Sequence, residues 1–252
     1  MASLRLYVLV FTAALMLAVV PNAGAIVGGT ATSGVDTPVV FVGQMGAPRN
    51  ACTGVALSPT LVLTAAHCGL LLDGTAPAGQ PFAVFKGPSV AGATLRSGGV
   101  FIPHQDFRWG GSGVPHFADA DLAVVRVMGP PIPGPYATLA PLGSAEGLKG
   151  DRSLDIYGYG VSALIHGEPD PASFGTLRHG AARSLGVKNA DPEFLHFKGP
   201  ACVGDSGGPV LRDGQLLAVI SFAPSACHST NYATRVDTAE ARAFLAQFGF
   251  SG

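Results

Sequence analysis

The sequence predicts a mainly antiparallel β protein with a single helix near its end. Short apolar or alternating runs recur along the chain, as expected for strands that bury one face. Glycine and proline are abundant, with 35 and 20 copies. Clusters of them at 129–135 and 167–171 forbid long helices and suit exposed loops. The strands that we expect are 38–43, 52–57, 82–85, 122–127, 153–158 and 215–222.

The expected helix lies close to the end of the chain. Asp237 can cap its first turn, and Glu240 completes a capping box. Gly249 ends the helical pattern. Its apolar face consists of Ala241, Phe244, Leu245 and Phe248. We interpret this helix as a packing element.

Composition limits the classes of protein to which the chain can belong. Hydrophobic residues make up 48% and charged residues only 12%, so the chain can bury a sizeable core and is not disordered by charge repulsion. The formal net charge is −1, which provides no basic surface for a phosphate backbone. Nucleic acid is therefore not an expected partner. The length of 252 residues fits one large domain or two small ones.

The first 25 residues have the pattern of a secretory signal. An apolar run at 7–20 follows Arg5, and Ala23-Gly24-Ala25 matches the small residues at a signal peptidase site. A membrane anchor is the alternative, but the run is shorter than the about 20 residues that a spanning helix needs. We expect residues 1–25 to be removed, which leaves residues 26–252 as a secreted domain without membrane attachment.

The cysteines fit an oxidising compartment. There are four, Cys52, Cys68, Cys202 and Cys227, and in an exported chain they are expected to form bridges. Four cysteines permit three connectivities, and spacing alone does not choose among them. Pairing of neighbours would close short loops, each contributing on the order of 3 kcal/mol. The spacings do not suit zinc, so we expect no metal.

Three short strings carry residues for nucleophilic catalysis. They are TAAHC at 64–68, DLAVV at 121–125 and GDSGGP at 204–209. A serine hydroxyl becomes a good nucleophile when an imidazole takes its proton, and a buried carboxylate holds that imidazole in the right tautomer. His67, Asp121 and Ser206 supply these groups. The backbone amides of Gly204 and Ser206 can converge on an oxyanion, because glycine leaves room for them.

From the residues alone, a second aspartate could take the role assigned to Asp121. Asp119 lies two positions before Asp121, and alternation in a strand would place both side chains on the same face. Period therefore does not separate the two carboxylates.

Together with Ile26-Val27-Gly28-Gly29, the three strings resemble the chymotrypsin/trypsin-like family of serine peptidases over residues 26–236. The resemblance implies two six-stranded antiparallel β-barrels with the active site between them, and a boundary near 129–150. It also implies disulfides Cys52–Cys68 and Cys202–Cys227, and it favours Asp121 over Asp119. The implied activity is hydrolysis of polypeptides through an acyl-enzyme, without a cofactor. We expect a monomer.

The resemblance implies an activation device as well. In the family, a free α-amino group at the mature N-terminus pairs with the aspartate before the nucleophile, here Asp205. Cleavage after Ala25 by signal peptidase would itself create that amino group on Ile26, with no separate activation peptide.

The substrate pocket is assigned by the same resemblance. Its expected residues are Pro200, Ala201, Ser221, Phe222, Ala223 and Thr230. Pro200 stands at the floor, so no acid favours arginine or lysine, and Ala223 with Thr230 narrows the slot for small aliphatic residues. His228 offers an alternative preference for acidic residues. Ser221 also resembles the family serine that supports the buried aspartate.

Two other functions compete with that of a peptidase. One is an inactive homologue that uses the cleft only for binding, and the intact set of three residues argues against it. The other is an esterase or lipase, in which the nucleophile occupies an elbow between a strand and a helix. The string GDSGG does not have that setting.

Overall fold

The computed structural model describes residues 26–46, 51–110, 118–224, 227 and 229–251. The expected signal peptide at 1–25 and His228 lie outside the described residues. Within the described part of the chain, no helix has both the length and the apolar character needed to cross a membrane.

Six antiparallel strands close the first barrel in the order β2-β3-β4-β9-β6-β5. Their bounds are β2 (Val39–Gln44), β3 (Ala51–Ser58), β4 (Leu61–Thr64), β5 (Pro81–Lys86), β6 (Leu95–Pro103) and β9 (Ala123–Val127). Apolar side chains fill the interior, among them Val42, Val62, Phe82, Phe101 and Val125. The short apolar runs of the sequence thus become barrel strands, because each must bury at least one face.

A second barrel follows, with the strand order β13-β10-β15-β16-β17-β14 and a β13–β14 pairing that closes it. The bounds are β10 (Leu154–Gly158), β13 (Arg178–Lys188), β14 (Asp191–Lys198), β15 (Pro209–Arg212), β16 (Gln215–Phe222) and β17 (Thr230–Arg235). The strand β1 (Thr30–Ala31) adds to the outside edge of β13. The predicted pair of six-stranded barrels is confirmed. Residues 128–153, which include the expected boundary region, connect β9 to β10.

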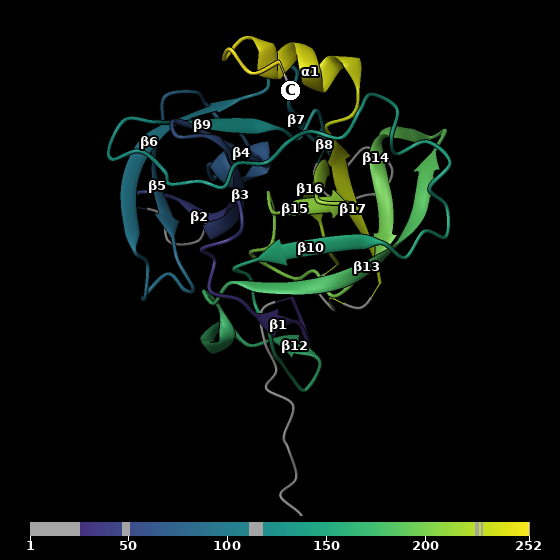
Figure 1. Cartoon of the computed structure of the whole chain (residues 1–252), viewed down its shortest axis with the longest axis horizontal. Coiled ribbons are helices and arrows are strands. Elements are labelled where there is room, and N and C mark those ends of the chain that lie inside the picture. Colours follow the sequence, from purple (N-terminus) through teal and green to yellow (C-terminus); the bar gives the residue numbers. More distant parts are fainter. Residues whose placement is uncertain (1–25, 47–50, 111–117, 225–226, 228, 252) are drawn as a thin grey trace, which may run out of the picture.

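Short elements complete the chain. They are η1 (Ala66–Gly69), β7 (Arg108–Trp109), β8 (Ala118–Asp119), β11 (Leu164–Ile165), β12 (Glu168–Pro169), η2 (Pro171–Ser173) and α1 (Ala239–Ala246). Figure 1 shows the barrels side by side, the first in purple to blue and the second in green to yellow, with α1 across one end. Phe244 and Leu245 of α1 join a core cluster that contains Leu63 of the first barrel and Val219 of the second. The helix therefore packs over the seam, as its apolar face predicts.

The helix cap differs from the prediction. Thr238, not Asp237, is the N-cap, and its hydroxyl oxygen accepts the N–H of Ala241 at 3.2 Å. Glu240 therefore lies one position short of the third helical residue, where a capping box needs it. Asp237 is buried and accepts hydrogen bonds from Arg235, because a buried guanidinium requires a carboxylate more than the helix requires that cap.

This ion pair generates a test of stability. The Asp237 carboxylate accepts from Arg235 at 2.9 and 3.1 Å and from the N–H of Ala145 at 2.7 Å. Asp237→Ala leaves the buried guanidinium without these partners, so the free energy of unfolding should fall by about 3–5 kcal/mol. Glu146→Ala removes a carboxylate that is 66% exposed and also contacts Arg235, and should cost no more than about 1 kcal/mol. Urea unfolding in a Ser206→Ala background, which avoids self-digestion, measures both; equal losses would contradict this ranking.

Candidate active site

His67 sits in the η1 turn directly after strand β4. Cys68 beside it is joined to Cys52 of β3, with their Cα atoms 6.2 Å apart. Gly69 ends the turn against the ring of Phe101, where a Cβ atom would lie 2.3 Å from the ring. The turn is thus fixed from both sides, and the imidazole keeps 16% of its surface exposed.

Asp121 binds the imidazole from the buried side. Its Oδ2 lies 2.8 Å from His67 Nδ1, and its Oδ1 accepts the backbone N–H of His67 at 2.8 Å. The hydroxyl of Ser221 donates to the same Oδ2. Burial alone would raise the pKa of Asp121, but the charge of His67 and these hydrogen bonds outweigh burial and lower it. The carboxylate therefore stays ionised and orients His67 with its Nδ1 proton inward.

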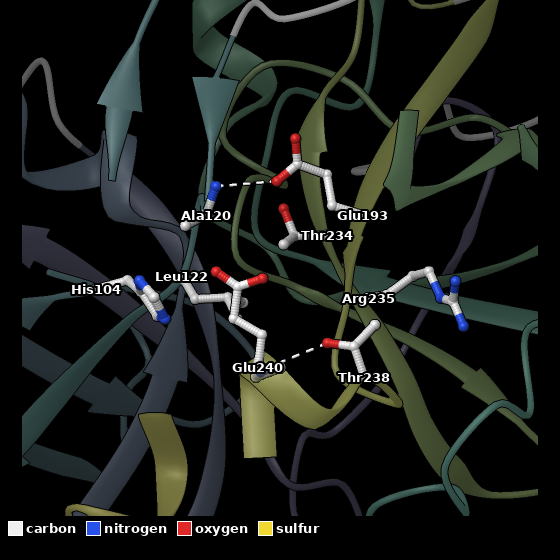
Figure 2. A pocket seen from close by; sticks show the side chains of 9 residues that line it. His104, Ala120, Leu122, Glu193, Thr234, Arg235, Thr238 and Glu240 are labelled. Atoms are coloured by element: carbon white, nitrogen blue, oxygen red, sulfur yellow. Dashed lines mark hydrogen bonds between the residues drawn. The ribbon is translucent and has the colours of Figure 1, made fainter. Parts of the chain in front are cut away.

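A turn separates Asp121 from Asp119, the other aspartate that could take the same role. Ala120 has φ +47°, a left-handed conformation that is rare outside glycine, and this breaks the alternation. Asp119 consequently lies exposed on β8, whereas Asp121 is fully buried. Glu193 of β14 holds the turn, since its carboxylate accepts the N–H of Ala120 at 3.0 Å (Figure 2). No local pattern in the sequence points to Glu193, because it acts from the other barrel.

Ser206 lies in the glycine-rich loop between β14 and β15. Its carbonyl oxygen accepts the N–H of Thr53 at 2.8 Å, which ties the loop to the first barrel. Gly207 follows with φ +78° and touches Thr64, since a Cβ atom there would lie 2.1 Å from the Thr64 hydroxyl. Ser206 is thereby placed beside the strand end that leads into His67.

The hydroxyl of Ser206 donates to the carbonyl oxygen of Ser221 at 3.5 Å. Within the described residues it makes no hydrogen bond to His67, so that contact stays a prediction. Catalytic hydrogen bonds are often long before substrate binds, so this does not argue against the pairing.

The amides expected to form the oxyanion hole belong to Gly204 and Ser206. Within the described part of the chain, the N–H groups of Gly204 and Ser206 donate to no acceptor. Gly204 has φ +92° and packs against Phe174, where a Cβ atom would lie 2.5 Å from the ring. Its carbonyl oxygen is turned away from the site and accepts the hydroxyl of Thr53 at 3.0 Å. Two free amides beside a nucleophile can stabilise an oxyanion.

Asp205 is completely buried, and within the described residues every hydrogen bond to its carboxylate comes from a backbone amide. The N–H of Cys202 donates at 2.8 Å and that of Gly160 at 2.9 Å, and the N–H of Ile26 donates as well. Burial raises the pKa of Asp205 to about 7, and these amides only partly oppose the effect. Among the described residues, this carboxylate has no positively charged partner.

Ile26 approaches this carboxylate from the start of the described chain. Its side chain is buried in the core of the second barrel, and the neighbouring Val27 N–H donates to Pro200 at 2.8 Å. Gly180 makes the space, because a Cβ atom there would lie 2.5 Å from the Ile26 side chain. The two members of the expected activation pair therefore lie together.

The residues assigned to the pocket have different roles in the structure. Ala201 is fully buried in the core of the second barrel, and Ala223 packs against the same cluster. Phe222 is partly buried against Phe194, and Thr230 pairs with Lys198 at the start of β17. Cys202 next to them is bonded to Cys227, as the resemblance implied.

One aromatic residue beside the site was not anticipated. The ring of Trp109 lies 5.7 Å from the imidazole of His67, centroid to centroid, and is 37% exposed. It partly covers the catalytic side of the first barrel. The chain contains one tryptophan, so its fluorescence reports on this site alone.

Cys52, His67 and Cys68 also converge closely enough to suggest a metal site. The two sulfurs are joined in a disulfide, so neither offers the thiolate that zinc requires. This cluster does not hold a metal.

Comparison with known proteins agrees with the geometry. The family model described as Trypsin matches residues 26–242. The chain belongs to the trypsin family. As a trypsin-family member, it is a serine endopeptidase that acts on peptide substrates.

Individual relatives are distant. The chain is 24% identical over 187 residues to snake venom serine protease BthaTL of Bothrops alternatus. The aligned region covers 70% of this chain and 76% of the relative. Its fold matches HL collagenase with a TM-score of 0.63 and 17% identity, over 88% of this chain and 97% of the other. It also matches a Glu endopeptidase solved in complex with MPD, with a TM-score of 0.62 and 16% identity, over 87% and 94%. These two structures show the shared trypsin-family fold.

The tight space around Asp205 gives a prediction for activity. A Cβ atom on Gly160 would lie 2.6 Å from Asp205 Oδ1 and 2.6 Å from the carbonyl oxygen of Val203. Gly160→Ala should displace the loop that carries the free amides and lower kcat/KM by about 100-fold, as loss of an oxyanion donor does. Gly98→Ala, whose Cβ would come no closer than 3.7 Å to a neighbour, is the matched control. Hydrolysis of a peptide substrate measures both, and equal activity would contradict the assigned role of the loop.

Proposed function

We propose that the enzyme cleaves peptide bonds through an acyl-enzyme, with Ser206 as nucleophile, His67 as general base and acid, and Asp121 as the group that orients His67. The observation that carries this proposal is the contact of 2.8 Å between His67 Nδ1 and a fully buried Asp121. That contact leaves Nε2 of the imidazole to take the proton of Ser206 and return it to the leaving amine.

The oxyanion of the tetrahedral intermediate would be held by the amides of Gly204 and Ser206. Their N–H groups have no other acceptor within the described residues, so they need not break a bond to receive the charge. Donors that are already oriented stabilise developing charge without reorganisation. In subtilisin, loss of one such donor costs about 100- to 1,000-fold in rate.

We assign the pocket to Pro200, Ala201, Ser221, Phe222, Ala223 and Thr230, and propose a preference for small aliphatic residues on the acyl side. The absence of an acid at Pro200 supports a pocket that does not select arginine or lysine. The backbone of residues 221–223, at the end of β16, would pair with an extended substrate as an added strand. Cleavage of a peptide library tests this preference, and cuts after arginine or lysine would refute it.

The cellular setting belongs to the same proposal. We propose that residues 1–25 are a secretory signal, that the mature enzyme is a secreted monomer without membrane or nucleic-acid partners, and that turnover needs no cofactor. The two disulfides and the venom relative support export, because disulfides persist in oxidising compartments.

An inactive homologue is the main rival function. The intact contact of Asp121 with His67 and the free amides disfavour it, because a binding module has no need of either. A fluorophosphonate probe discriminates the two, since it labels only a serine that is activated. Absence of labelling at Ser206 in the correctly processed protein would favour the rival.

Single substitutions test the catalytic roles. Ser206→Ala should abolish turnover, and Asp121→Asn should lower kcat by about 10,000-fold, the magnitude that the general template for this class of enzyme gives. Asp119→Asn is the matched control and should change kcat less than about threefold, because this exposed side chain does not contact the imidazole. Steady-state hydrolysis of a peptide substrate gives the three values. An Asp119→Asn variant as inactive as Asp121→Asn would move the role to Asp119.

Processing at Ile26 gives a second test. In the whole chain the nitrogen of Ile26 is an uncharged peptide nitrogen, and burial keeps the pKa of Asp205 raised to about 7. A cut after Ala25 would turn this nitrogen into an ammonium, which favours the ionised carboxylate and fixes the loop. We therefore expect protein that starts at Ile26 to be active, and protein with extra residues before Ile26 to be at least tenfold less active.

The two forms should respond to pH in different ranges, because a different group titrates in each. In the longer form, Asp205 has a folded-state pKa above its unfolded value of 3.8, so stability should decrease as the pH rises from about 4 to 7. In the form that starts at Ile26, activity should fall above about pH 8, where an α-amino group loses its proton. N-terminal sequencing of the secreted enzyme, thermal unfolding and a pH profile of kcat/KM measure these outcomes. A flat alkaline profile would contradict the ion pair.

A further inference from the structure

A tight backbone turn presents Asp121 to His67, and Glu193 of the other barrel contacts this turn. The turn closes with the N–H of Leu122 on the carbonyl oxygen of Ala120 at 2.7 Å, and Asp121 is its central residue. The N–H of Ala120 donates outward to the Glu193 carboxylate at 3.0 Å (Figure 2). One hydrogen bond and one peptide bond therefore connect Glu193 to the residue that binds the imidazole.

The turn needs this support from outside. Ala120 has φ +47°, which is unfavourable for alanine because its Cβ atom crowds its own backbone. The residue is only 9% exposed, so water has little access to its N–H. Within the described residues, the carboxylate of Glu193 is the one acceptor of that N–H. A buried amide without an acceptor is unfavourable, so loss of the carboxylate should let the turn relax.

The position of this turn decides three hydrogen bonds of Asp121. Its Oδ1 accepts the backbone N–H of His67 at 2.8 Å, and its Oδ2 lies 2.8 Å from His67 Nδ1. The hydroxyl of Ser221 donates to the same Oδ2. Because these donors reach the carboxylate from different sides, a shift of its backbone weakens at least one of them. A misplacement of about 1 Å can lower a rate by about 100-fold, even when the substitution is remote from the reacting atoms.

Stability alone does not explain an acid at position 193. Burial raises the pKa of Glu193, and the charges of Asp119, Glu240 and Asp121 raise it further, whereas the hydrogen bond from Ala120 lowers it. The ionised side chain thus lies where burial and repulsion both disfavour its charge. An apolar side chain would avoid this cost, but it could not accept the N–H of Ala120.

We propose that Glu193 is a positioning residue for Asp121, and that turnover depends on its hydrogen bond to Ala120. Glu193 acts through the turn and does not contact the imidazole. The inference rests on the proposed function, in which Asp121 orients His67. It makes a strand of the second barrel responsible for the placement of an aspartate of the first.

Substitutions at position 193 test this dependence. Glu193→Leu keeps a similar volume but removes the acceptor, so kcat should fall about 10- to 100-fold while KM changes less than about threefold. Glu193→Gln keeps an oxygen that can accept the N–H of Ala120, so its kcat should stay within about threefold of the parent. Steady-state hydrolysis of a peptide substrate, below the Tm of every variant, gives these values. Equal kcat in Glu193→Leu and the parent, or equal losses in Glu193→Leu and Glu193→Gln, would overturn the proposal.

The matched controls are Glu240→Leu and Glu240→Gln. Glu240 lines the same small hollow as Glu193 and Ala120, but within the described residues it makes no hydrogen bond to Ala120. Both controls should therefore keep the kcat of the parent, and a loss as large as that of Glu193→Leu would contradict a role specific to Glu193. Glu193→Ala, which also lacks the acceptor, replaces Glu193→Leu if the larger side chain prevents folding.

A spectroscopic measurement tests the positioning without turnover. In a Ser206→Ala background, the proton on His67 Nδ1 faces the Asp121 carboxylate, and its downfield ¹H resonance reports this charge-assisted hydrogen bond. Glu193→Leu should move the resonance upfield, whereas Glu193→Gln and Glu240→Leu should leave it in place. An unchanged resonance in Glu193→Leu would overturn the proposal. An inactive parent enzyme would refute the proposed function instead, and the resonance would still decide whether Glu193 positions Asp121.

Discussion

Thr53 of the first barrel fixes the loop of the second barrel on which the active site is built. Its N–H donates to Ser206 at 2.8 Å, its hydroxyl donates to Gly204 at 3.0 Å, and the same hydroxyl accepts the N–H of Tyr159 at 3.0 Å. Thr53 is fully buried, so loss of any one bond would leave a polar group unpaired at a cost of about 1–3 kcal/mol. Because Cys52 beside it is bonded to Cys68, the same anchor reaches the residue after His67.

Asp121 and Asp205 are both completely buried, but their pKa values are shifted in opposite directions. Asp121 receives a ring nitrogen, a backbone amide and a hydroxyl, and these partners hold its pKa low despite complete burial. The partners of the Asp205 carboxylate in the described chain are backbone amides, and burial raises its pKa to about 7. Asp121 is therefore held ionised beside His67. Ionisation of Asp205 depends on its partners, and in the proposed activation it would follow from a charged N-terminus at Ile26.

The sequence predicts those features that depend on local pattern. The six expected strands are found because each buries apolar side chains in a barrel, and helix α1 follows from its apolar face. The helix cap was assigned wrongly, since Asp237 serves the buried Arg235 and Thr238 takes its place. Alternation did not separate Asp119 from Asp121, because the left-handed turn at Ala120 is held by Glu193 from a distant strand. A contact between residues that are far apart in the sequence cannot be predicted from one short motif.

Each functional loop is thus anchored by the opposite barrel. Thr53 of the first barrel holds the loop of Ser206, while Glu193 and Ser221 of the second hold Asp121 and the turn before it. A shift of one barrel against the other would strain all these contacts together. The core cluster beneath α1 contains side chains from both barrels and opposes such a shift. Packing at the seam therefore bears on the proposed catalysis, because the relative positions of His67, Asp121 and Ser206 are set by the fit between two cores and not by either barrel alone.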